Sequence, residues 1–328
     1  MNECTQIMGY DLYQGNSFQV LEEEFDKNSI HAVVTDPPYS VIEFETAHVE
    51  KMRDGKGGVW RIPPELDGNK RKPLPRFTVL TEDDKDKLRN FFKQFGEAVE
   101  RVLRPGGHVF VACTQLLMHE VSQQLDEAGL ERRDVLIRET KTLRGGDRPK
   151  GAHDHPEYKM VSSMPRVYWE PWLLYRKPFD RRLDENLGEW QTGGLRRESD
   201  ERPFTDLLGN GKTPKEETEI VKNAHPGGEE EVEAHPNLKP QKLMRELCHA
   251  ALPLREGTIL DPFMGSGSTI AAAYALGYDA VGIELDETFY EMAQNAIPNL
   301  AEVPTEIEKR DDVEEHRTQS RSLSDFSN

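Results

Sequence analysis

Residues 258–269 read Thr258-Ile-Leu-Asp261-Pro-Phe-Met-Gly265-Ser-Gly267-Ser-Thr269, and the chain continues through Ile270-Ala-Ala-Ala-Tyr-Ala-Leu276. This order predicts a strand, a glycine turn and a helix in direct succession. Glycine lets the backbone approach a ligand closely, and the first N–H groups of a helix point toward an anionic group. The stretch therefore predicts a ligand-binding turn, with a purely structural tight turn as the alternative.

The residues around this turn limit the kind of ligand. Gly277 ends the helix, and a predicted strand from Ala280 to Ile283 leads into Glu284, an acid suited to hydrogen bonding with ribose hydroxyls. Nicotinamide, flavin and methyl-donor proteins all use such an arrangement. Ile270 stands where a dinucleotide fingerprint has its third Gly or Ala, and no Gly-Lys-Ser/Thr follows the turn. The pattern therefore counts against a dinucleotide and, more clearly, against a phosphate loop.

A second motif follows another apolar run. The run His31-Ala-Val-Val-Thr35 leads directly into Asp36-Pro37-Pro38-Tyr39-Ser40. An acid at the carboxyl end of a central strand lies where open α/β sheets place their active sites. Two prolines fix φ and remove two backbone donors, so Asp36 and the Pro37 carbonyl can act as rigid hydrogen-bond acceptors.

Acceptors of this kind suit the exocyclic amine of a nucleic-acid base. The lone pair of such an amine is delocalised into the ring, and hydrogen bonds from both N–H groups to Asp36 and a main-chain carbonyl would localise it for attack on a methyl group. Tyr39 would provide the face on which an extruded base stacks. The alternative is a proline turn that ends a strand, with Asp36 as a turn residue and Tyr39 in the core.

The rest of the chain alternates apolar runs with segments of helical period, which is typical of an open α/β sheet with crossover helices. The predicted strands are 32–35, 108–113, 172–176, 258–260 and 280–283. The predicted helices are 84–103, 116–128, 241–251, 269–276 and 286–297, the last with Asp286 as its N-cap and Pro298 as its end.

The bulk properties indicate a globular protein. The chain has 328 residues with 36% hydrophobic content, has no apolar run long enough to cross a bilayer, and begins without the pattern of a signal peptide. Cys4, Cys113 and Cys248 form no CxxC pair, so neither a disulfide framework nor a cysteine-zinc site is indicated. We expect a cytoplasmic protein without a bound metal.

The charge distribution matters more than the net charge of −18, which is unusual for a protein that must approach phosphates. Arginines gather between residues 132 and 202, and a smaller basic stretch covers residues 51–76. Acidic residues crowd elsewhere, so a molecule with two differently charged faces is one interpretation. A solvated acidic surface without a direct functional role is the alternative.

Taken together, Asp36-Pro-Pro-Tyr39 and Asp261-Pro-Phe-Met-Gly-Ser-Gly267 resemble the motifs of the amino-methyltransferase family of DNA modification enzymes. The catalytic motif precedes the cofactor motif, which is similar to the permuted β-class order. Three shorter matches extend the resemblance over most of residues 10 to 300: Gly15-Asn16-Ser17, Leu103-Arg-Pro-Gly-Gly107 and His235-Pro-Asn-Leu-Lys239-Pro240.

The resemblance implies a Rossmann-like methyltransferase fold, a mostly parallel twisted sheet with helices on both faces and an inserted target-recognition region. We expect a catalytic half at 1–140, a target-recognition region at 141–233, a cofactor-binding half at 234–301 and a disordered acidic tail at 302–328. The segment 41–76, rich in Gly, Pro, Lys and Arg, is expected to be a long functional or disordered loop.

The resemblance also implies S-adenosylmethionine as the cofactor. Lys239 is expected near the methionine end of the cofactor, with a solvated lysine as the alternative. Asn16 stands where the family commonly has Asp, and its side-chain oxygen can still accept a hydrogen bond from the adenine of the cofactor. The expected cofactor-binding residues are Asn16, Asp36, Lys239, Asp261, Phe263, Gly265, Ser266, Gly267, Ser268, Thr269 and Glu284, and the expected catalytic residues are Asp36, Pro37, Pro38 and Tyr39.

Arginine, glycine and aromatic residues between the two motifs predict the DNA-binding surface. The candidates are Arg144, Arg148, Arg166, Trp169, Arg196 and Arg197. Exposed loop arginines and a core tryptophan are the alternatives. Trp172 is a further candidate to cradle an extruded base. His153-Asp-His155 resembles half of a metal site but has no further ligands nearby in the sequence.

The sequence thus predicts a site-specific DNA methyltransferase that acts on the N6 amino group of a flipped adenine. Asp36 at the first motif position leans toward adenine, and N4-cytosine methylation is the alternative. Methylation of RNA or of a protein amide, or a DNA-binding subunit without catalysis, are weaker alternatives. Double-stranded DNA on the nucleoid is the expected partner, no membrane is involved, and the sequence leaves open a partner restriction endonuclease and a homodimer.

Overall fold

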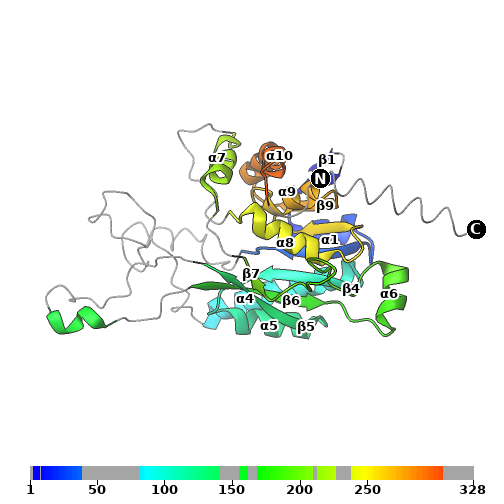
Figure 1. Ribbon diagram of the computed structural model, residues 1–328, viewed down its shortest axis with the longest axis horizontal. Coiled ribbons are helices and arrows are strands. Elements are labelled where there is room, and N and C mark those ends of the chain that lie inside the picture. The colour runs from blue at the N-terminus through cyan, green and yellow to red at the C-terminus, as the bar shows by residue number, and fades with distance from the viewer. Residues whose placement is uncertain are drawn as a thin grey trace, which may run out of the picture.

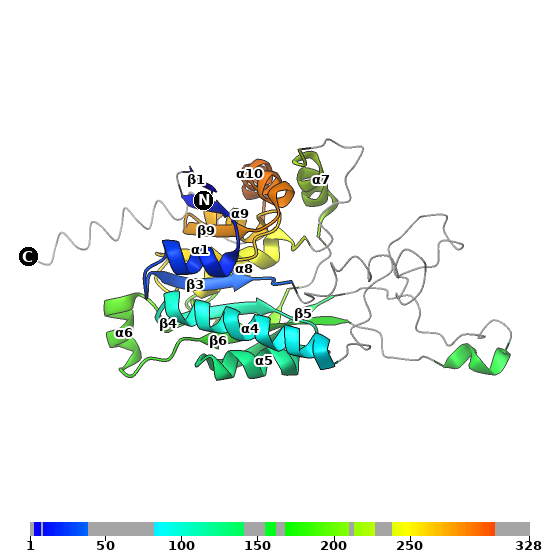
Figure 2. The same ribbon diagram turned by 180° about the vertical axis from the view of Figure 1, so that it is seen from behind.

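The computed structural model describes residues 3–7, 9–38, 82–140, 155–161, 168–209, 213–226 and 238–305. These residues form one sheet that lies between two layers of helices (Figures 1 and 2). The predicted α/β class is confirmed.

Nine strands form the sheet in the described part of the chain, in the order β1-β2-β9-β8-β3-β4-β6-β5-β7. The five strands from β2 to β4 in this order are parallel, β1 is antiparallel to β2, and β6 is antiparallel to both β4 and β5. The strands are β1 (Glu3–Ile7), β2 (Tyr10–Gln14), β3 (Ile30–Thr35), β4 (Leu103–Ala112), β5 (Glu131–Glu139), β6 (Trp169–Arg176), β7 (Leu207–Leu208), β8 (Thr258–Asp261) and β9 (Asp279–Glu284).

The central strand β3 is buried on both faces, as expected for a parallel strand covered by helices. Successive side chains of a strand point to opposite faces, so Ala32 and Val34 join one hydrophobic core and Val33 joins the other. One core is covered by α8 (Gln241–Ala251), α9 (Ser268–Ala275) and α10 (Glu287–Ala301), which appear together in Figure 1. The other is covered by α1 (Ser17–Glu24), α4 (Glu82–Val102) and α5 (Met118–Glu127), which are in view in Figure 2.

Three further helices complete the described part of the chain. They are α6 (Leu183–Trp190), α7 (Lys215–Asn223), which contacts α10, and the 3-10 helix η2 (Pro156–Met160). The segment expected to recognise the target, 141–233, therefore also supplies β6, α6 and β7, and β6 is a central strand of the sheet.

All five predicted strands and all five predicted helices correspond to observed elements. β1, β2, β5 and β7 were not predicted, nor were α1, α6 and α7. The first half of β5 is charged, Glu131-Arg-Arg-Asp134, and Arg132 to Asp134 are exposed. Among the described residues, only the two-residue β7 pairs with this strand on its outer side, so the strand can carry charged residues that hide its periodicity.

The prediction that the last helix ends at Pro298 is wrong, because α10 continues through this residue to Ala301. Proline inside a helix removes a backbone hydrogen bond at a cost of about 3 kcal/mol. Ile297 and Leu300, on either side of it, are fully buried in the core, and their burial offsets that cost. Asp286 caps the start of α10 as predicted, since its side chain accepts a hydrogen bond from the N–H of Phe289 at 3.0 Å.

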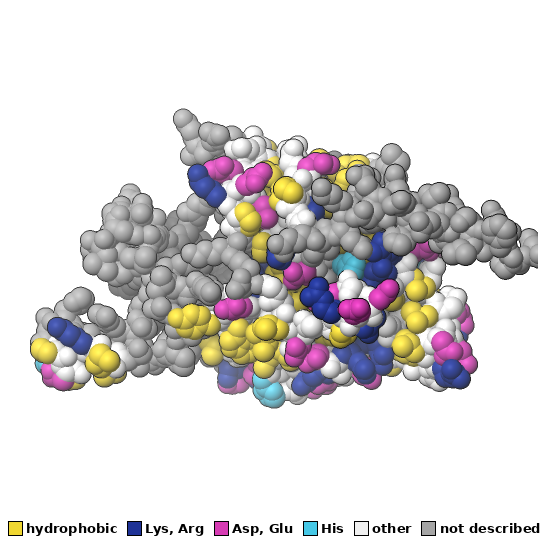
Figure 3. Space-filling model, in the orientation of Figure 1, with side chains coloured by type: hydrophobic (Ala, Val, Ile, Leu, Met, Phe, Trp, Pro, Cys, Tyr) yellow, Lys and Arg dark blue, Asp and Glu magenta, His cyan; other side chains and the backbone are white. Residues whose placement is uncertain are grey.

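The surface in Figure 3 carries acidic and basic side chains that are interspersed over the described residues. Across the described ranges, no helix has both the length and the apolar character that spanning a membrane requires.

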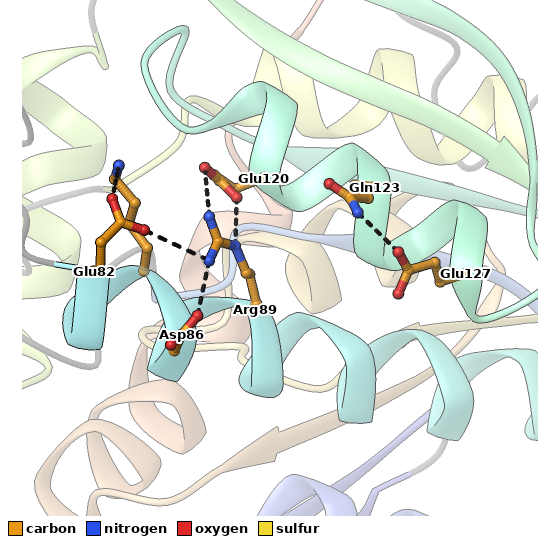
Figure 4. A network of polar contacts seen from close by, with 7 residues as sticks. Glu82, Asp86, Arg89, Glu120, Gln123 and Glu127 are labelled. Carbon is orange, nitrogen blue, oxygen red and sulfur yellow. Dashed lines mark hydrogen bonds and ion pairs between the residues drawn. The ribbon is translucent and has the colours of Figure 1, made fainter.

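Arg89 links the two helices α4 and α5 on one face of the sheet. Its guanidinium donates to Glu120 of α5 at 2.7 Å and to Asp86 of its own helix at 2.8 Å (Figure 4). Lys85 and Glu82 form a further pair in the first turn of α4. Of these contacts, the one between Arg89 and Glu120 joins the two helices, and the others lie within α4.

Candidate active site

The two sequence motifs meet at one edge of the sheet. β3 pairs in parallel with β8, and β8 pairs in parallel with β9, so their carboxyl ends lie side by side. Asp36 follows β3, the glycine turn follows β8, and Glu284 ends β9. Thr35, the residue before Asp36, donates a hydrogen bond from its hydroxyl to Asp261 at 2.7 Å. The structure thus brings together the carboxylate and the turn that the sequence placed far apart, at the edge where open α/β sheets bind ligands.

Asp36 lies at this edge with its side chain 16% exposed. One carboxylate oxygen, Oδ2, forms an ion pair with Nζ of Lys239 at 2.9 Å. Pro37 is buried and Pro38 is partly buried, whereas Tyr39 lies outside the described residues. The Asp36 carboxylate is therefore partly open, and its immediate charged neighbour is a buried ammonium group.

Lys239 also contacts a second carboxylate, that of Glu170 at the start of β6, at 3.2 Å. Burial alone would lower the pKa of Lys239, but the carboxylates of Asp36 and Glu170 raise it above its usual value. The lysine is thus held protonated between two acids. The ammonium group lies at the catalytic motif. A contact between Lys239 and the cofactor stays a prediction.

Glu170 is itself held by two further donors. Trp172 of the same strand donates its indole N–H to Oε1 at 3.0 Å, and Arg138 of β5 donates to Oε2 at 3.2 Å. Burial would raise the pKa of Glu170, but the charges of Lys239 and Arg138 hold it below its usual value. Arg138 and Glu170 are directly opposite each other in the β5–β6 ladder. Strand register therefore fixes this part of the site.

Asp261, at the end of β8, organises the glycine turn from within. Its carboxylate accepts hydrogen bonds from the hydroxyls of Thr35 and Thr269, at 2.7 and 2.5 Å, and from the N–H of Phe263 at 3.1 Å. Burial raises the pKa of Asp261 to about 6 against the opposing effect of these donors. Asp261 therefore ties β3, the turn and the start of α9 to one another.

The turn itself requires its glycines. Gly265 has φ 52° and Gly267 has φ 85°, both in the left-handed region that favours glycine. A Cβ atom on Gly267 would lie 2.5 Å from Cγ1 of Ile297, so this residue also allows α10 to approach the turn. α9 begins at Ser268, directly after Gly267, and its first turn, with the buried Ser268 and Thr269, faces the same edge as Asp36. Ser266 is buried beside it in the turn.

Glu284 joins the turn to β9. One oxygen accepts the N–H of Gly265 and the other accepts the N–H of Asp286, each at 2.9 Å. Burial raises the pKa of Glu284 above its usual value. Each carboxylate oxygen can accept a second hydrogen bond, so Glu284 can also receive a hydroxyl donor at this edge.

Asn16 and Phe263 contribute to the same edge from the other side. The side-chain oxygen of Asn16 caps α1 by accepting the N–H groups of Phe18 and Gln19, at 3.1 and 3.3 Å. This oxygen is therefore already engaged within the protein. Phe263 lies in an aromatic cluster with Phe18 and Phe91, at centroid distances of 6.3 and 5.5 Å. It forms an apolar wall between the turn and α4.

The predicted DNA-binding residues fall into three groups. Arg144, Arg148 and Arg166 lie outside the described residues. Trp169 begins β6, one residue before Glu170, and is therefore at the edge that carries Asp36.

Arg196 and Arg197 lie elsewhere. Arg196 donates to His249 at 3.1 Å and to the Pro253 carbonyl at 3.2 Å, in the segment that leads from α8 into the start of β8. Arg197 donates to the carbonyl oxygens of the nearby Ser199 and Asp200. The amino ends of the parallel strands lie here, so the structure separates both arginines from the edge that carries Asp36.

Sequence reasoning missed Glu170, Arg138 and Thr35. Glu170 offered a signal, because it is a charged residue in the otherwise apolar stretch Trp169-Glu-Pro-Trp-Leu-Leu-Tyr175. Such a residue in a buried strand needs a partner. Arg138 offered no comparable signal, since β5 carries several arginines and only the pairing of strands distinguishes them.

No cluster of three or more His, Cys, Asp or Glu residues suited to a metal ion occurs in the ranges that the structure describes. His153, one of the two histidines noted in the sequence, lies outside these ranges. The other, His155, has its Nδ1 atom 3.3 Å from Oε1 of Glu157.

Comparison with known proteins identifies related sequences. The family model of N6/N4 methyltransferases, described as DNA methylase, matches residues 30–295. The type II methyltransferase M.HindIII of Haemophilus influenzae is 24% identical over 306 residues, which cover 86% of this chain and 94% of that protein. The type II methyltransferase M.MjaI of Methanocaldococcus jannaschii is 23% identical over 309 residues, which cover 84% of this chain and 87% of that protein.

Solved structures share the fold. The cytosine-N4-specific PvuII DNA methyltransferase has a TM-score of 0.54 at 15% identity, over 92% of this chain and 88% of that chain. The M1.HpyAVI complex with S-adenosylmethionine has a TM-score of 0.50 at 15% identity, and the match covers 88% of this chain and 98% of that chain.

Proposed function

Because the chain belongs to the N6/N4 family of DNA methylases, we propose that it methylates the N6 amino group of an adenine turned out of double-stranded DNA. Transfer of a methyl group to DNA is the activity of this family, and S-adenosylmethionine is the methyl donor. The observation that carries the proposal is the parallel pairing of β3 with β8, which sets the Asp36 carboxylate beside the glycine turn.

The Asp36 carboxylate and the Pro37 carbonyl accept the two N–H groups of the target amine. Both are hydrogen-bond acceptors on a backbone that two prolines make rigid. Hydrogen bonds to both N–H groups direct the nitrogen lone pair out of the ring plane and toward the methyl donor. Tyr39 stacks on the extruded base in this proposal. Catalysis comes mainly from positioning the amine, since no covalent bond to the protein is needed.

The residues around the turn fit the cofactor by their chemistry. Bound S-adenosylmethionine supplies a methyl group on a positively charged sulfur. Glu284 can accept hydrogen bonds from its ribose hydroxyls, and the first N–H groups of α9 suit its carboxylate. Phe263 supplies an apolar surface, and Gly265, Ser266, Gly267, Ser268 and Thr269 shape the turn around the cofactor. The contact of Asn16 with the cofactor adenine is the weakest of these assignments, because its oxygen already caps α1.

Adenine is proposed over cytosine because Asp36 stands at the first position of the motif. The N4 amine of cytosine presents the same two N–H groups, so the geometry of the acceptors suits both bases. Digestion of methylated DNA to nucleosides, followed by mass measurement, distinguishes the two. We expect to find N6-methyldeoxyadenosine. Detection of N4-methyldeoxycytidine in its place would refute the adenine assignment.

Substitution of Asp36 tests the catalytic assignment. Asp36→Ala removes the acceptor and is expected to abolish transfer of a radiolabelled methyl group into DNA, while calorimetry still detects binding of S-adenosylmethionine. Asp180→Ala is a matched control, because the Asp180 side chain is 98% exposed on the surface. It should keep full activity. An active Asp36→Ala enzyme would refute the role of Asp36.

Recognition of DNA is proposed for Arg144, Arg148, Arg166, Trp169, Arg196 and Arg197. Arginine contacts to phosphates or base edges should make DNA affinity fall as salt rises. A partner restriction endonuclease, a homodimer and association with the nucleoid are further proposals that follow from a type II methyltransferase relationship.

A further inference from the structure

Four charged side chains meet beside the proposed catalytic carboxylate. They are the acids Asp36 and Glu170 and the bases Lys239 and Arg138, joined in the order Asp36, Lys239, Glu170, Arg138 by contacts of 2.9, 3.2 and 3.2 Å. Their side chains are between 6% and 21% exposed. Because two positive and two negative charges alternate, the cluster is close to neutral. The attraction between the opposite charges offsets part of the desolvation penalty of burying them.

The backbone that carries Lys239 is fixed on both sides. The hydroxyl of Thr213 donates to the Leu238 carbonyl at 2.5 Å. Glu217 of α7 accepts the N–H of Gln241 at 2.9 Å, and the Gln241 side chain donates to the Ser268 carbonyl at the start of α9. Lys239 is therefore held in place, and its ammonium group has little freedom to leave the cluster.

An ammonium group this close to Asp36 has two opposed effects. It stabilises the ionised carboxylate, which the target amine needs as an acceptor. It also competes for the carboxylate lone pairs and makes the oxygen it contacts a weaker acceptor. The second effect is smaller when another carboxylate shares the ammonium, and Glu170 is placed to do this.

Building on the proposed function, we propose that Glu170 is a positioning residue for methyl transfer. Lys239 stabilises the ionised Asp36 carboxylate, and Glu170, by sharing the Lys239 ammonium, leaves that carboxylate able to accept the N–H of the target amine. Glu170 does not need to touch the base. Its own orientation is set by Trp172 and Arg138, both of which donate to it.

The charged and titratable groups around Asp36 come from several elements. Lys239 precedes α8, Asp261 ends β8 and Cys113 follows β4, while Glu170 and Arg138 act from β6 and β5. Glu170 and Lys239 carry opposite charges in this set, so Glu170→Gln and Lys239→Met change the electrostatic potential at the site in opposite directions. The two changes should therefore move the acid side of the pH profile in opposite directions.

The test measures the single-turnover rate of methyl transfer with saturating cofactor as a function of pH. Glu170→Gln keeps the size of the side chain and removes its charge. We expect a maximal rate at least about tenfold lower, because Lys239 then contacts Asp36 alone and makes the carboxylate a weaker acceptor for the target amine. We also expect the acid limb of the profile to move to lower pH. Lys239→Met removes a positive charge and should move that limb to higher pH.

Glu170→Asp is the conservative variant. It retains the charge at a shorter reach, and its rate should lie between those of the wild type and Glu170→Gln. It also keeps the test decisive if Glu170→Gln does not fold. In all three variants the calorimetric affinity for S-adenosylmethionine should stay within about twofold of the wild type. Loss of cofactor affinity in Lys239→Met would instead assign this lysine to the cofactor and overturn the inference.

Glu131→Gln is the matched control. Glu131 pairs with Arg176 at 2.6 Å on the same two strands, β5 and β6, but at the opposite end of the ladder from Glu170. A general weakening of the sheet would affect both variants alike. Equal rates for Glu170→Gln and Glu131→Gln, or acid limbs that do not move in opposite directions, would overturn the positioning role.

The wild-type protein separates the two proposals. An active wild type with an unaffected Glu170→Gln variant would refute only the role of Glu170. A wild type that binds DNA and S-adenosylmethionine but transfers no methyl group would refute the proposed function and this inference with it.

Discussion

At the scale of single residues, the site depends on two strand-end carboxylates that differ in how many hydrogen bonds their oxygens accept from the protein. Asp261 accepts three hydrogen bonds and connects elements, whereas Asp36, only partly buried, stays open at the edge. Both are strand-end acids in the sequence, each followed by proline. The difference between them comes from the hydroxyl neighbours Thr35 and Thr269, which surround Asp261.

Thr35→Val tests this division. Valine has nearly the same shape but cannot donate, so the buried Asp261 carboxylate loses one of its donors. We expect the free energy of unfolding, measured in urea, to fall by about 1–3 kcal/mol. The loss should be larger at pH 8 than at pH 5, because the pKa of Asp261 is raised to about 6 and the ionised form depends more on the lost donor.

The control is Thr218→Val, since the Thr218 hydroxyl donates to the Pro214 carbonyl on an exposed turn of α7. That variant should unfold close to the wild-type midpoint. If the two variants unfolded at the same urea concentration, the Thr35 hydroxyl would not stabilise Asp261.

At the scale of elements, the glycine turn is the point where β8, α9 and α10 come together. The sequence predicted the turn and the elements on both sides, because strand, glycine and helix signals are local. It did not predict that Gly267 lies against Ile297 of α10, because that contact joins segments whose relative position only the folded sheet defines. The same reason explains the error at Pro298, where buried neighbours decide the length of α10.

Gly267→Ala should therefore be costly. The left-handed φ of 85° costs a residue with a Cβ atom about 1–2 kcal/mol, and the Cβ would lie 2.5 Å from Ile297. We expect a lower urea midpoint together with weaker binding of S-adenosylmethionine. Gly188→Ala in α6 is the matched control, because a Cβ there meets no atom within 4 Å.

Alanine in a helix interior is more favourable than glycine by about 0.5–1 kcal/mol, so Gly188→Ala should raise stability and leave cofactor affinity unchanged. A Gly267→Ala protein with wild-type stability and affinity would contradict the close approach of the turn to α10.

At the scale of the whole molecule, the order of strands decides which charges meet. The apolar runs of β3, β4, β8 and β9 could be recognised in the sequence, and they build the central sheet. The partners of Glu170 could not, because β5 and β6 reach the site by antiparallel pairing at the far side of β4. The direction of the parallel strands separates Arg196, near their amino ends, from Asp36 at their carboxyl ends, although sequence composition grouped all the arginines together. Local patterns thus predicted the acceptor and the turn, and long-range pairing determined their charged surroundings.

Two buried histidines make the stability of the whole protein depend on pH. Burial, with the nearby Arg104, lowers the pKa of His31 to about 4, and its Nδ1 accepts the N–H of Thr258 at 3.0 Å. Burial, with Arg176 and Arg133, lowers the pKa of His108 to about 3. Both must be neutral in the folded protein, whereas in the unfolded chain they gain protons below pH 6.5 or so.

Stability should therefore be constant above about pH 6.5 and fall as the pH drops toward 4, where the unfolded chain binds more protons. The carboxyl groups whose pKa is raised in the folded protein, such as Asp261 and Glu284, act in the opposite sense as the pH falls. Carboxyl groups whose pKa is lowered, such as Glu131 and Glu170, act in the same sense as the histidines. The effect can be measured as the change in the urea midpoint of unfolding between about pH 7.5 and about pH 4.5. This is the range over which the histidines of the unfolded chain take up protons. His31→Asn retains an acceptor for the Thr258 N–H and cannot be protonated, so its midpoint should depend less on pH. An equal pH dependence in this variant and the wild type would show that His31 does not contribute.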